Sequence, residues 1–348
     1  MPYKITLLFF ILFIGKITLS ITTNPLPLSL NLAYDPYWTE DAQEANNNIN
    51  HFIEPADDIN YTNYRYVGIH NGHVYPRFFK IIRQQDQTII GNLSYGVRGL
   101  MLDTYNWSFP WFSTLQGPKN AKVCLSHTPP GIIAFMQKAT FVYQTMKYEL
   151  RRIIEFMKIN EQAVITIILE DYAHAIQTAQ EIKEVMIEAQ YDPLFKPNDL
   201  INEQWPTLGW MRHNNKRLII FTQRAHTTDV TFNQFNYMAE NQYSTTNEKK
   251  LCTLRQESPL TSSLYAFNNF SGIPLTLPTI ITKNQVDYIT VKRIIKNCVI
   301  KKLAGGKIFN GYWADHIINS CNYLYAQEKK TIFEYVNELN AHSNKTIP

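Results

Sequence analysis

The sequence predicts an α/β protein of the (β/α)8 type, a TIM barrel with irregularities, and three observations support this class. The 348 residues are 45% hydrophobic and 18% charged, which suits a large core and excludes a disordered chain or a coiled coil. Short apolar runs alternate with longer segments of helical periodicity. His or acidic residues follow several of the apolar runs. Such alternation along one long domain favours a barrel over a doubly wound sheet.

The predicted strands are short apolar runs bounded by polar or turn residues. They are residues 66–70, 97–105, 121–127, 163–170, 217–222, 264–268 and 308–315. The predicted helices carry apolar residues at positions i, i+3, i+4 and i+7. They are residues 76–93, 131–158, 175–190, 284–301 and 326–339.

The first 20 residues have the pattern of a secretory signal peptide, with Lys4 before an apolar run and Ser20 at the end. The apolar run is shorter than the ~20 residues that span a bilayer. Residues 21–60 are a Pro- and Asn-rich N-terminal extension, and residues 61–342 are predicted as the barrel domain. We therefore expect a secreted, extracellular protein. A net charge of +4 with scattered basic residues excludes nucleic acid as a partner.

Cysteines and sequons fit this secretory route. The four cysteines allow three pairings if all of them pair. We predict a disulfide between Cys252 and Cys298, and a buried thiol at Cys124 within an apolar strand. Glycosylation candidates stand in Asn-x-Ser/Thr motifs at Asn60, Asn92, Asn106, Asn269 and Asn344.

Five of the predicted strands end in a His or a carboxylate. These ends are His70 with Asn71, Asp103, His127, Glu170 with Asp171, and Asp315. A single residue of this kind is usually a hydrogen-bonded loop anchor. Because the carboxyl ends of barrel strands meet at one mouth, where barrels carry their active sites, we expect the five to form one site. His316, beside Asp315, is a further candidate there. Arg98 near the start of the second strand is expected to be structural.

This set of residues suits displacement at a phosphodiester. One His can take a proton from an attacking hydroxyl while the other gives a proton to the leaving oxygen. The charge that develops on phosphorus also needs a cation, either an Arg or a metal ion held by hard oxygen ligands. Asn71, Asp103 and Glu170 carry oxygens of the kind that Ca²⁺ accepts. No other cofactor is expected.

Eight segments, in order, resemble the catalytic X region of phosphatidylinositol-specific phospholipases C (PI-PLC). They are residues 66–75 (YVGIHNGHVY), 96–105 (GVRGLMLDTY), 123–128 (VCLSHT), 164–172 (VITIILEDY), 205–208 (WPTL), 216–222 (KRLIIFT), 240–243 (ENQY) and 311–317 (GYWADHI). The chain is most similar to the secreted, single-domain, plant-like members. The resemblance implies a barrel phosphodiesterase that acts on inositol phospholipids at a membrane surface.

The resemblance also implies roles for individual residues. His70 corresponds to the general base that acts on the inositol 2-hydroxyl, and His127 to the general acid for the diacylglycerol oxygen. Asp315 corresponds to the acid that orients the first His. Residues at the calcium-ligand positions of the calcium-dependent branch, which would hold Ca²⁺ or stabilise charge on the substrate, are Asn71, Asp103 and Glu170. An adjacent hydroxyl attacks with high effective molarity, so a cyclic inositol phosphate forms first.

Three residues depart from the family pattern. Ile69 and Gly72 stand where the family has Thr and Ser, and Met101 stands where calcium-dependent members have a Glu ligand. A site without that carboxylate should bind Ca²⁺ more weakly. One alternative is therefore a weak or inactive barrel that binds lipid or inositol phosphate. Another is a glycerophosphodiester or sphingomyelin hydrolase, although Asn71-Gly72 in place of Arg-Gly after His70 argues against it.

The segment after the second strand, residues 106–112 (NWSFPWF), is rich in aromatic side chains. Trp and Phe partition well into the lipid interface, so this segment predicts interfacial, non-spanning contact with a phospholipid membrane. The alternative is a loop folded back on the barrel.

Overall fold

The computed structural model describes residues 47–73, 85–107, 122–125, 145–223, 228–242, 248–259, 262–270, 279–300 and 308–342. The chain divides after Glu40 into two units, and every described residue belongs to the second. The predicted signal peptide, His127 and Asn344 lie outside the described residues, and the limits of the extension and of the barrel domain stay predictions. No described helix is both long enough and apolar enough to span a bilayer.

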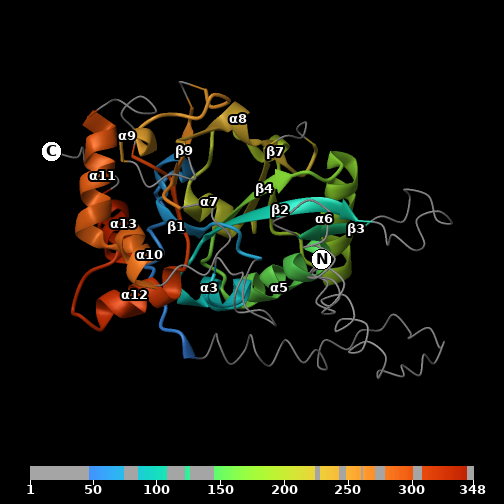
Figure 1. Cartoon of the computed structure of the whole chain (residues 1–348). Helices are drawn as coiled ribbons and strands as arrows, with labels where there is room; N and C mark the ends of the chain where they lie inside the picture. The colour runs from blue at the N-terminus through green and yellow to red at the C-terminus, as the bar shows by residue number, and fades with distance from the viewer. Residues whose placement is uncertain are drawn as a thin grey trace, which may run out of the picture. The chain divides into compact units, whose positions relative to one another are not determined.

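Eight parallel strands follow one another in chain order across a barrel-like sheet in the described part of the chain (Figure 1). They are β1 (Tyr66–Ile69), β2 (Gly99–Trp107), β4 (Ile165–Asp171), β6 (Leu218–Thr222), β7 (Phe232–Asn233), β8 (Met238–Glu240), β9 (Leu264–Asn268) and β10 (Gly311–Ala314). The first strand, β1, pairs with β2 on one edge and with the last strand, β10, on the other. This arrangement confirms the predicted α/β barrel class.

The sheet is irregular at one seam. No pairing between described residues joins β7 to β8, which are connected by the single turn of α8 (Gln234–Tyr237). The same edge of β6 is shared by two short strands: β5 (Leu194–Phe195) pairs with its first residues and β7 with its last.

One segment predicted as a parallel strand of the barrel sheet is not one of its parallel strands. The segment predicted at 121–127 contains β3 (Lys122–Leu125), which pairs antiparallel with β2. An apolar hairpin partner and a parallel barrel strand have the same local pattern, so periodicity alone could not separate them.

Apart from α8, the helices described beside these strands are longer than one turn, with α9 as the exception. They are α3 (Ile89–Tyr95), α5 (Met146–Ile159), α6 (Ala175–Ala189), α7 (Leu208–His213), α9 (Glu248–Leu251), α10 (Thr279–Val286), α11 (Tyr288–Ile300), α12 (Ile317–Tyr325) and α13 (Ile332–Ala341). Short 3₁₀ helices span Tyr61–Asn63 and Pro197–Asp199. Figure 1 shows α10 to α13 grouped together, and α5 and α6 grouped beside β2 and β4.

Capping residues set the starts of three helices inside the predicted segments. Of the segment predicted at 76–93, residues 76–84 lie outside the described residues, and α3 begins at residue 89, where the Thr88 hydroxyl accepts the Gly91 N–H. The helix predicted at 284–301 is interrupted at Asp287, whose carboxylate accepts the Thr290 N–H at the start of α11. The helix predicted at 326–339 begins after Thr331, which forms a capping box with Glu334. Caps satisfy the first free amides of a helix, and apolar periodicity does not record them.

The interior of the barrel is filled by aromatic side chains. A Cβ atom on Gly68 would lie 2.3 Å from the Trp313 ring, and one on Gly99 would lie 2.7 Å from it. The glycines thus make room for an indole that is fully buried. Below it, the Tyr61 hydroxyl hydrogen-bonds to the Thr166 hydroxyl at 2.6 Å. The barrel is solid under its mouth.

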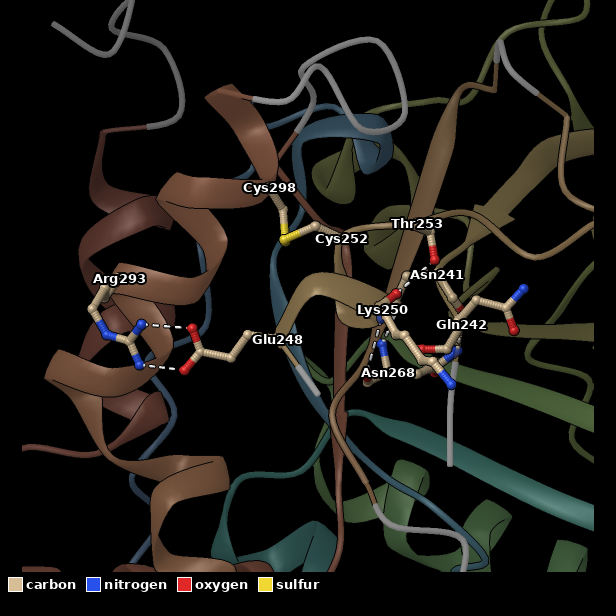
Figure 2. Close-up of a disulfide and its surroundings, with 9 residues drawn as sticks. All are labelled: Asn241, Gln242, Glu248, Lys250, Cys252, Thr253, Asn268, Arg293 and Cys298. Carbon is tan, nitrogen blue, oxygen red and sulfur yellow. Dashed lines mark hydrogen bonds and ion pairs between the residues drawn. A yellow bond between two sulfur atoms is a disulfide. The ribbon is translucent and has the colours of Figure 1, made fainter. Parts of the chain in front are cut away.

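The predicted disulfide is confirmed. Cys252, just after α9, is bonded to Cys298 on α11, with 4.8 Å between the Cα atoms (Figure 2). Beside it, Arg293 of α11 donates to both carboxylate oxygens of Glu248, at 2.7 and 2.6 Å. Cys124 is buried and is not part of a disulfide, as predicted. Cys321 is likewise buried and not part of a disulfide, and burial raises the pKa of its thiol.

Candidate functional site

Alternation along the strands decides which polar side chains enter the barrel. Gly68, Gly99 and Trp313 lie inside, whereas Leu102 and Ile167 line a small apolar cavity shared with α5 and α6. Because successive strand residues face opposite sides, the last interior positions can be read from the register. They carry His70, Asp103, Glu170, Glu240, Asn268 and Asp315. The structure thus brings four of the predicted strand-end residues, His70, Asp103, Glu170 and Asp315, together at one mouth.

His70 and Asp315 form a buried pair between adjacent strands, which we call the dyad. The His70 Nδ1 atom is 3.0 Å from Oδ1 of Asp315, and the two residues are 5% and 1% exposed. The His70 N–H also donates to the carbonyl of Ala314, which continues the pairing of β1 with β10. On its face the imidazole stacks on Phe270, with 3.6 Å between the ring centres. The carboxylate and the stacking ring fix the orientation of the imidazole.

Ile69 and Gly72, two of the departures from the family pattern, are matched to each other. Asn71 adopts a left-handed conformation with φ of +48°, which turns the chain sharply after β1. The Gly72 N–H then donates to the carbonyl of Met101. A Cβ on Gly72 would lie only 2.9 Å from Cδ1 of Ile69. The absence of a side chain at Gly72 thus leaves room for the Ile69 side chain. The turn that presents His70 is retained.

Asp103 and Glu170 are partners in register on β2 and β4. Their backbones are therefore about 4.8 Å apart, the spacing of neighbouring strands. Burial raises the pKa of Glu170, the negative charge of Asp103 raises it further, and His70 opposes the shift. These two carboxylates offer hard oxygen ligands, and so does the buried Asn71 just after β1. A cation between the two carboxylates would relieve their excess negative charge.

The donor set fits a weakly held calcium ion rather than a closed metal site. Met101, at the interior position before Asp103, is 1% exposed and contributes no carboxylate. Within the described residues no three His, Cys, Asp or Glu side chains are grouped as metal ligands. Asn71, Asp103 and Glu170 therefore stay the predicted ligands, and calcium binding stays a prediction.

The mouth also contains residues that sequence reasoning missed. Glu240 at the end of β8 is 0% exposed, and its carboxylate accepts hydrogen bonds from Arg255 and, at 3.1 Å, from Asn268. Burial raises the pKa of Glu240, and the positive charge of Arg255 opposes that shift. Arg255 comes from the loop between α9 and β9. Its positive charge also lowers the pKa of Glu170. Glu240 lies in the ENQY segment of the resemblance, which assigned it no role, and nothing in the sequence placed a cation beside it.

Other predicted candidates lie away from the dyad or outside the described residues. His316 pairs with Asp86, with 2.9 Å between Nδ1 and Oδ1. Arg98 is structural, as expected: its Nη1 donates to the carbonyls of Leu93 and Val97. Most of the aromatic segment at 106–112 falls in residues 108–121, which are not described. Where β2 and β4 end, however, Tyr105 stacks on Tyr172 with 4.6 Å between the ring centres.

Burial corrects two of the glycosylation candidates. Asn92 is 1% exposed, and its Nδ2 donates to two carbonyls at the start of α3. Asn269 is 7% exposed, and its Nδ2 donates to the Tyr312 hydroxyl. A glycan attached to either amide would have no room in this fold. Asn60 and Asn106 are half-buried and stay candidates.

The raised pKa of Glu170 predicts how stability depends on pH. The folded protein holds this proton more tightly than the unfolded chain, so its stability falls as pH rises through the interval between the ordinary and the raised pKa. Glu170→Gln should therefore stabilise the metal-free protein at pH 7.5, by roughly 1 kcal/mol. Near pH 4 the gain should nearly vanish, because Glu170 is then largely protonated, and so neutral, in both the folded and the unfolded protein.

Thermal unfolding at the two pH values, with a calcium chelator present, measures this effect. Glu161→Gln is the matched control, because Glu161 is exposed on the loop before β4. A gain of equal size at pH 4 and pH 7.5 would show that the Glu170 charge is not its cause.

Comparison with known proteins confirms the resemblance. The PI-PLC X family model matches residues 133–270, which begin after His70. A PI-PLC X domain-containing protein of Arabidopsis thaliana is 32% identical over 203 residues, covering 55% of this chain and 43% of that protein. The aligned region thus spans less than half the length of that relative.

Solved structures of two bacterial enzymes also match. The phosphatidylinositol-specific phospholipase C of Listeria monocytogenes has a TM-score of 0.46 and 13% identity, over 85% of this chain and 98% of that one. A structure of the S. aureus phosphatidylinositol-specific phospholipase C has a TM-score of 0.48 and 11% identity, over 84% of this chain and 95% of that one.

Proposed function

We propose that this chain, a relative of the PI-PLC X family through residues 133–270, is a phosphoric diester hydrolase of the phospholipase C type that acts on inositol phospholipids. The buried His70–Asp315 dyad carries the proposal. It lies at the carboxyl ends of adjacent barrel strands, next to Asp103 and Glu170, where barrels perform their chemistry.

The dyad supports general base catalysis by His70. Because Nδ1 is held by Asp315, the proton of the inositol 2-hydroxyl would go to Nε2. The freed oxygen attacks phosphorus, and the bond from phosphorus to the diacylglycerol oxygen breaks. His127 would give that oxygen its proton, and Asp315 would stabilise the imidazolium formed on His70. The products are diacylglycerol and a cyclic inositol phosphate, whose ring water then opens.

Two cationic groups could balance the charge on the phosphoryl oxygens. Calcium held by Asn71, Asp103 and Glu170 would act as a Lewis acid there. Arg255, which Glu240 orients at the mouth, supplies a permanent positive charge from the protein itself. The absence of a carboxylate at Met101 makes the contribution of Arg255 more important.

Other features support the proposed location and partner. A disulfide between Cys252 and Cys298 supports folding in an oxidising compartment, in keeping with the predicted signal peptide of residues 1–20 and with secretion. The substrate would be met at a phospholipid membrane surface. The stacked Tyr105 and Tyr172, with Tyr172 39% exposed, give the mouth an aromatic border suited to that interface.

A substrate panel tests the proposal. The full chain is incubated with vesicles that contain phosphatidylinositol, sphingomyelin or neither, and with glycerophosphodiesters, with and without a calcium chelator. Phosphorus NMR should show cyclic inositol phosphate from phosphatidylinositol only, at a rate that chelation lowers.

The other outcomes separate the alternatives. Phosphocholine released from sphingomyelin, or glycerophosphate released from the glycerophosphodiesters, would favour the alternative of a glycerophosphodiester or sphingomyelin hydrolase. No product from a folded protein that still binds inositol phosphate would favour the inactive binding barrel. Full release of cyclic inositol phosphate in the presence of chelator would reject a role for calcium and would still support the proposed hydrolase activity.

A further inference from the structure

The segment before α3 reaches back to the two strand ends that carry the dyad. Gln85 is completely buried, and its Nε2 donates to the carbonyl oxygen of His70 at 2.6 Å. The same Nε2 is 3.3 Å from the carbonyl oxygen of Ala314, the residue before Asp315. One side-chain amide therefore joins β1 to β10 at the point where the dyad projects from them.

The next residue holds the turn on the other side of Asp315. Oδ1 of Asp86 is 2.9 Å from Nδ1 of His316, and its Oδ2 accepts the N–H of Asn319 at 3.1 Å. His316 is the N-cap of α12, has a φ of +48° and makes no side-chain cap bond of its own. Asp86 thus caps α12 from another element and fixes the turn from which Asp315 extends.

These contacts are not needed to hold the sheet together. β1 and β10 already pair over four residues each, from Tyr66–Ile69 and from Gly311–Ala314. Moreover, Oε1 of Gln85 has no hydrogen-bond partner among the described residues. Leaving a buried acceptor unsatisfied is destabilising, so an amide here is a poor choice for stability alone.

We propose that Gln85 and Asp86 are positioning residues for the His70–Asp315 dyad. Gln85 sets the separation of the two strand ends, and Asp86 sets the direction from which the Asp315 carboxylate meets the imidazole. The expected effect on kcat rests on the proposed function. The expected effect on the geometry of the dyad rests on the hydrogen bonds alone. A displacement of about 1 Å at a reacting group can cost about 100-fold in rate.

The test replaces Gln85 by Leu, which keeps the volume and removes both hydrogen bonds. We expect kcat on phosphatidylinositol to fall about 10- to 100-fold with KM changed less than about 2-fold, because binding groups are untouched. The matched control is Gln87→Leu, in the same segment, whose side chain bonds to Asn48 and not to the dyad. The control should keep the kcat of the unchanged protein.

A second readout does not depend on turnover. In the ¹⁵N-histidine-labelled full chain at one fixed pH, the Nδ1 resonance of His70 reports its hydrogen bond to Asp315. It should move in Gln85→Leu and Asp86→Leu and stay in place in Gln87→Leu.

The outcomes distinguish this inference from the proposed function. Unchanged kcat and an unchanged His70 resonance in Gln85→Leu would overturn the positioning role. If Gln85→Leu does not fold, Asp86→Asn decides: it keeps one acceptor for Asn319 and should give a smaller shift of the same resonance, and no shift would overturn the inference. If the unchanged protein cleaves no lipid, the proposed function fails, and the resonance still tests the positioning.

Discussion

Replacing His70 by Ala is expected to lower kcat on phosphatidylinositol by about 10³- to 10⁴-fold, the upper range for loss of a general base. The imidazole is 5% exposed, is held by Asp315 at 3.0 Å and stacks on Phe270. The neighbouring His316 is already paired with Asp86. The reaction should therefore lose the proton acceptor that Asp315 orients.

Asp315→Asn should lower kcat by a comparable factor while the fold is kept. An amide at this position can hold the imidazole in the tautomer that places its proton on Nε2, and it no longer stabilises the imidazolium. Initial rates on phosphatidylinositol vesicles measure both variants. His213→Ala, an exposed His at the end of α7, is the control and should match the unchanged protein. Activity of His70→Ala within 10-fold of that of the unchanged protein would contradict the assigned role.

Loss of the disulfide should give the largest change in stability. Cys252 and Cys298 are 46 residues apart, and closing a loop of that length stabilises a folded protein by roughly 4 kcal/mol in the chain-entropy account. Replacing both cysteines by Ala should lower the free energy of unfolding by about 3–4 kcal/mol. Urea denaturation measures the difference.

The neighbouring ion pair provides the control for that experiment. Arg293 of α11 and Glu248 of α9 form an ion pair next to the disulfide (Figure 2), but both side chains are about half exposed, at 50% and 46%. Arg293→Gln should therefore lower the urea midpoint far less than the double Ala variant does. If the double Ala variant unfolds at the same urea concentration as Arg293→Gln, the disulfide contributes little to stability.

The longer elements of the fold were predictable from the sequence, because their burial leaves a pattern. The strand expected at 264–268 coincides with β9, and the helix expected at 175–190 coincides with α6 to within one residue. The strands β7 and β8 were missed, since two or three residues are too few to show alternation. The helix α12 was also missed, although it is nine residues long.

The candidate site was predictable only in part. His70, Asp103, Glu170 and Asp315 were identified because each ends an apolar run and a barrel brings such ends together. Arg255 and Gln85 belong to segments without periodicity, and their partners are Glu240, 15 residues away, and the carbonyl of Ala314, 229 residues away. Nothing in the order of residues records such approaches.

The pairing of β1 with β10 has a consequence for how the protein matures. His70 and Asp315 are 245 residues apart, so a growing chain contains the base long before the residue that orients it. Until β10 inserts between β9 and β1, the edge of β1 that it will cover is unpaired and open to other strands. Catalytic competence would therefore arise at the last step of folding. Chains that fail to complete the barrel would lack an assembled dyad, so the proposed phosphodiester cleavage would be restricted to completed molecules.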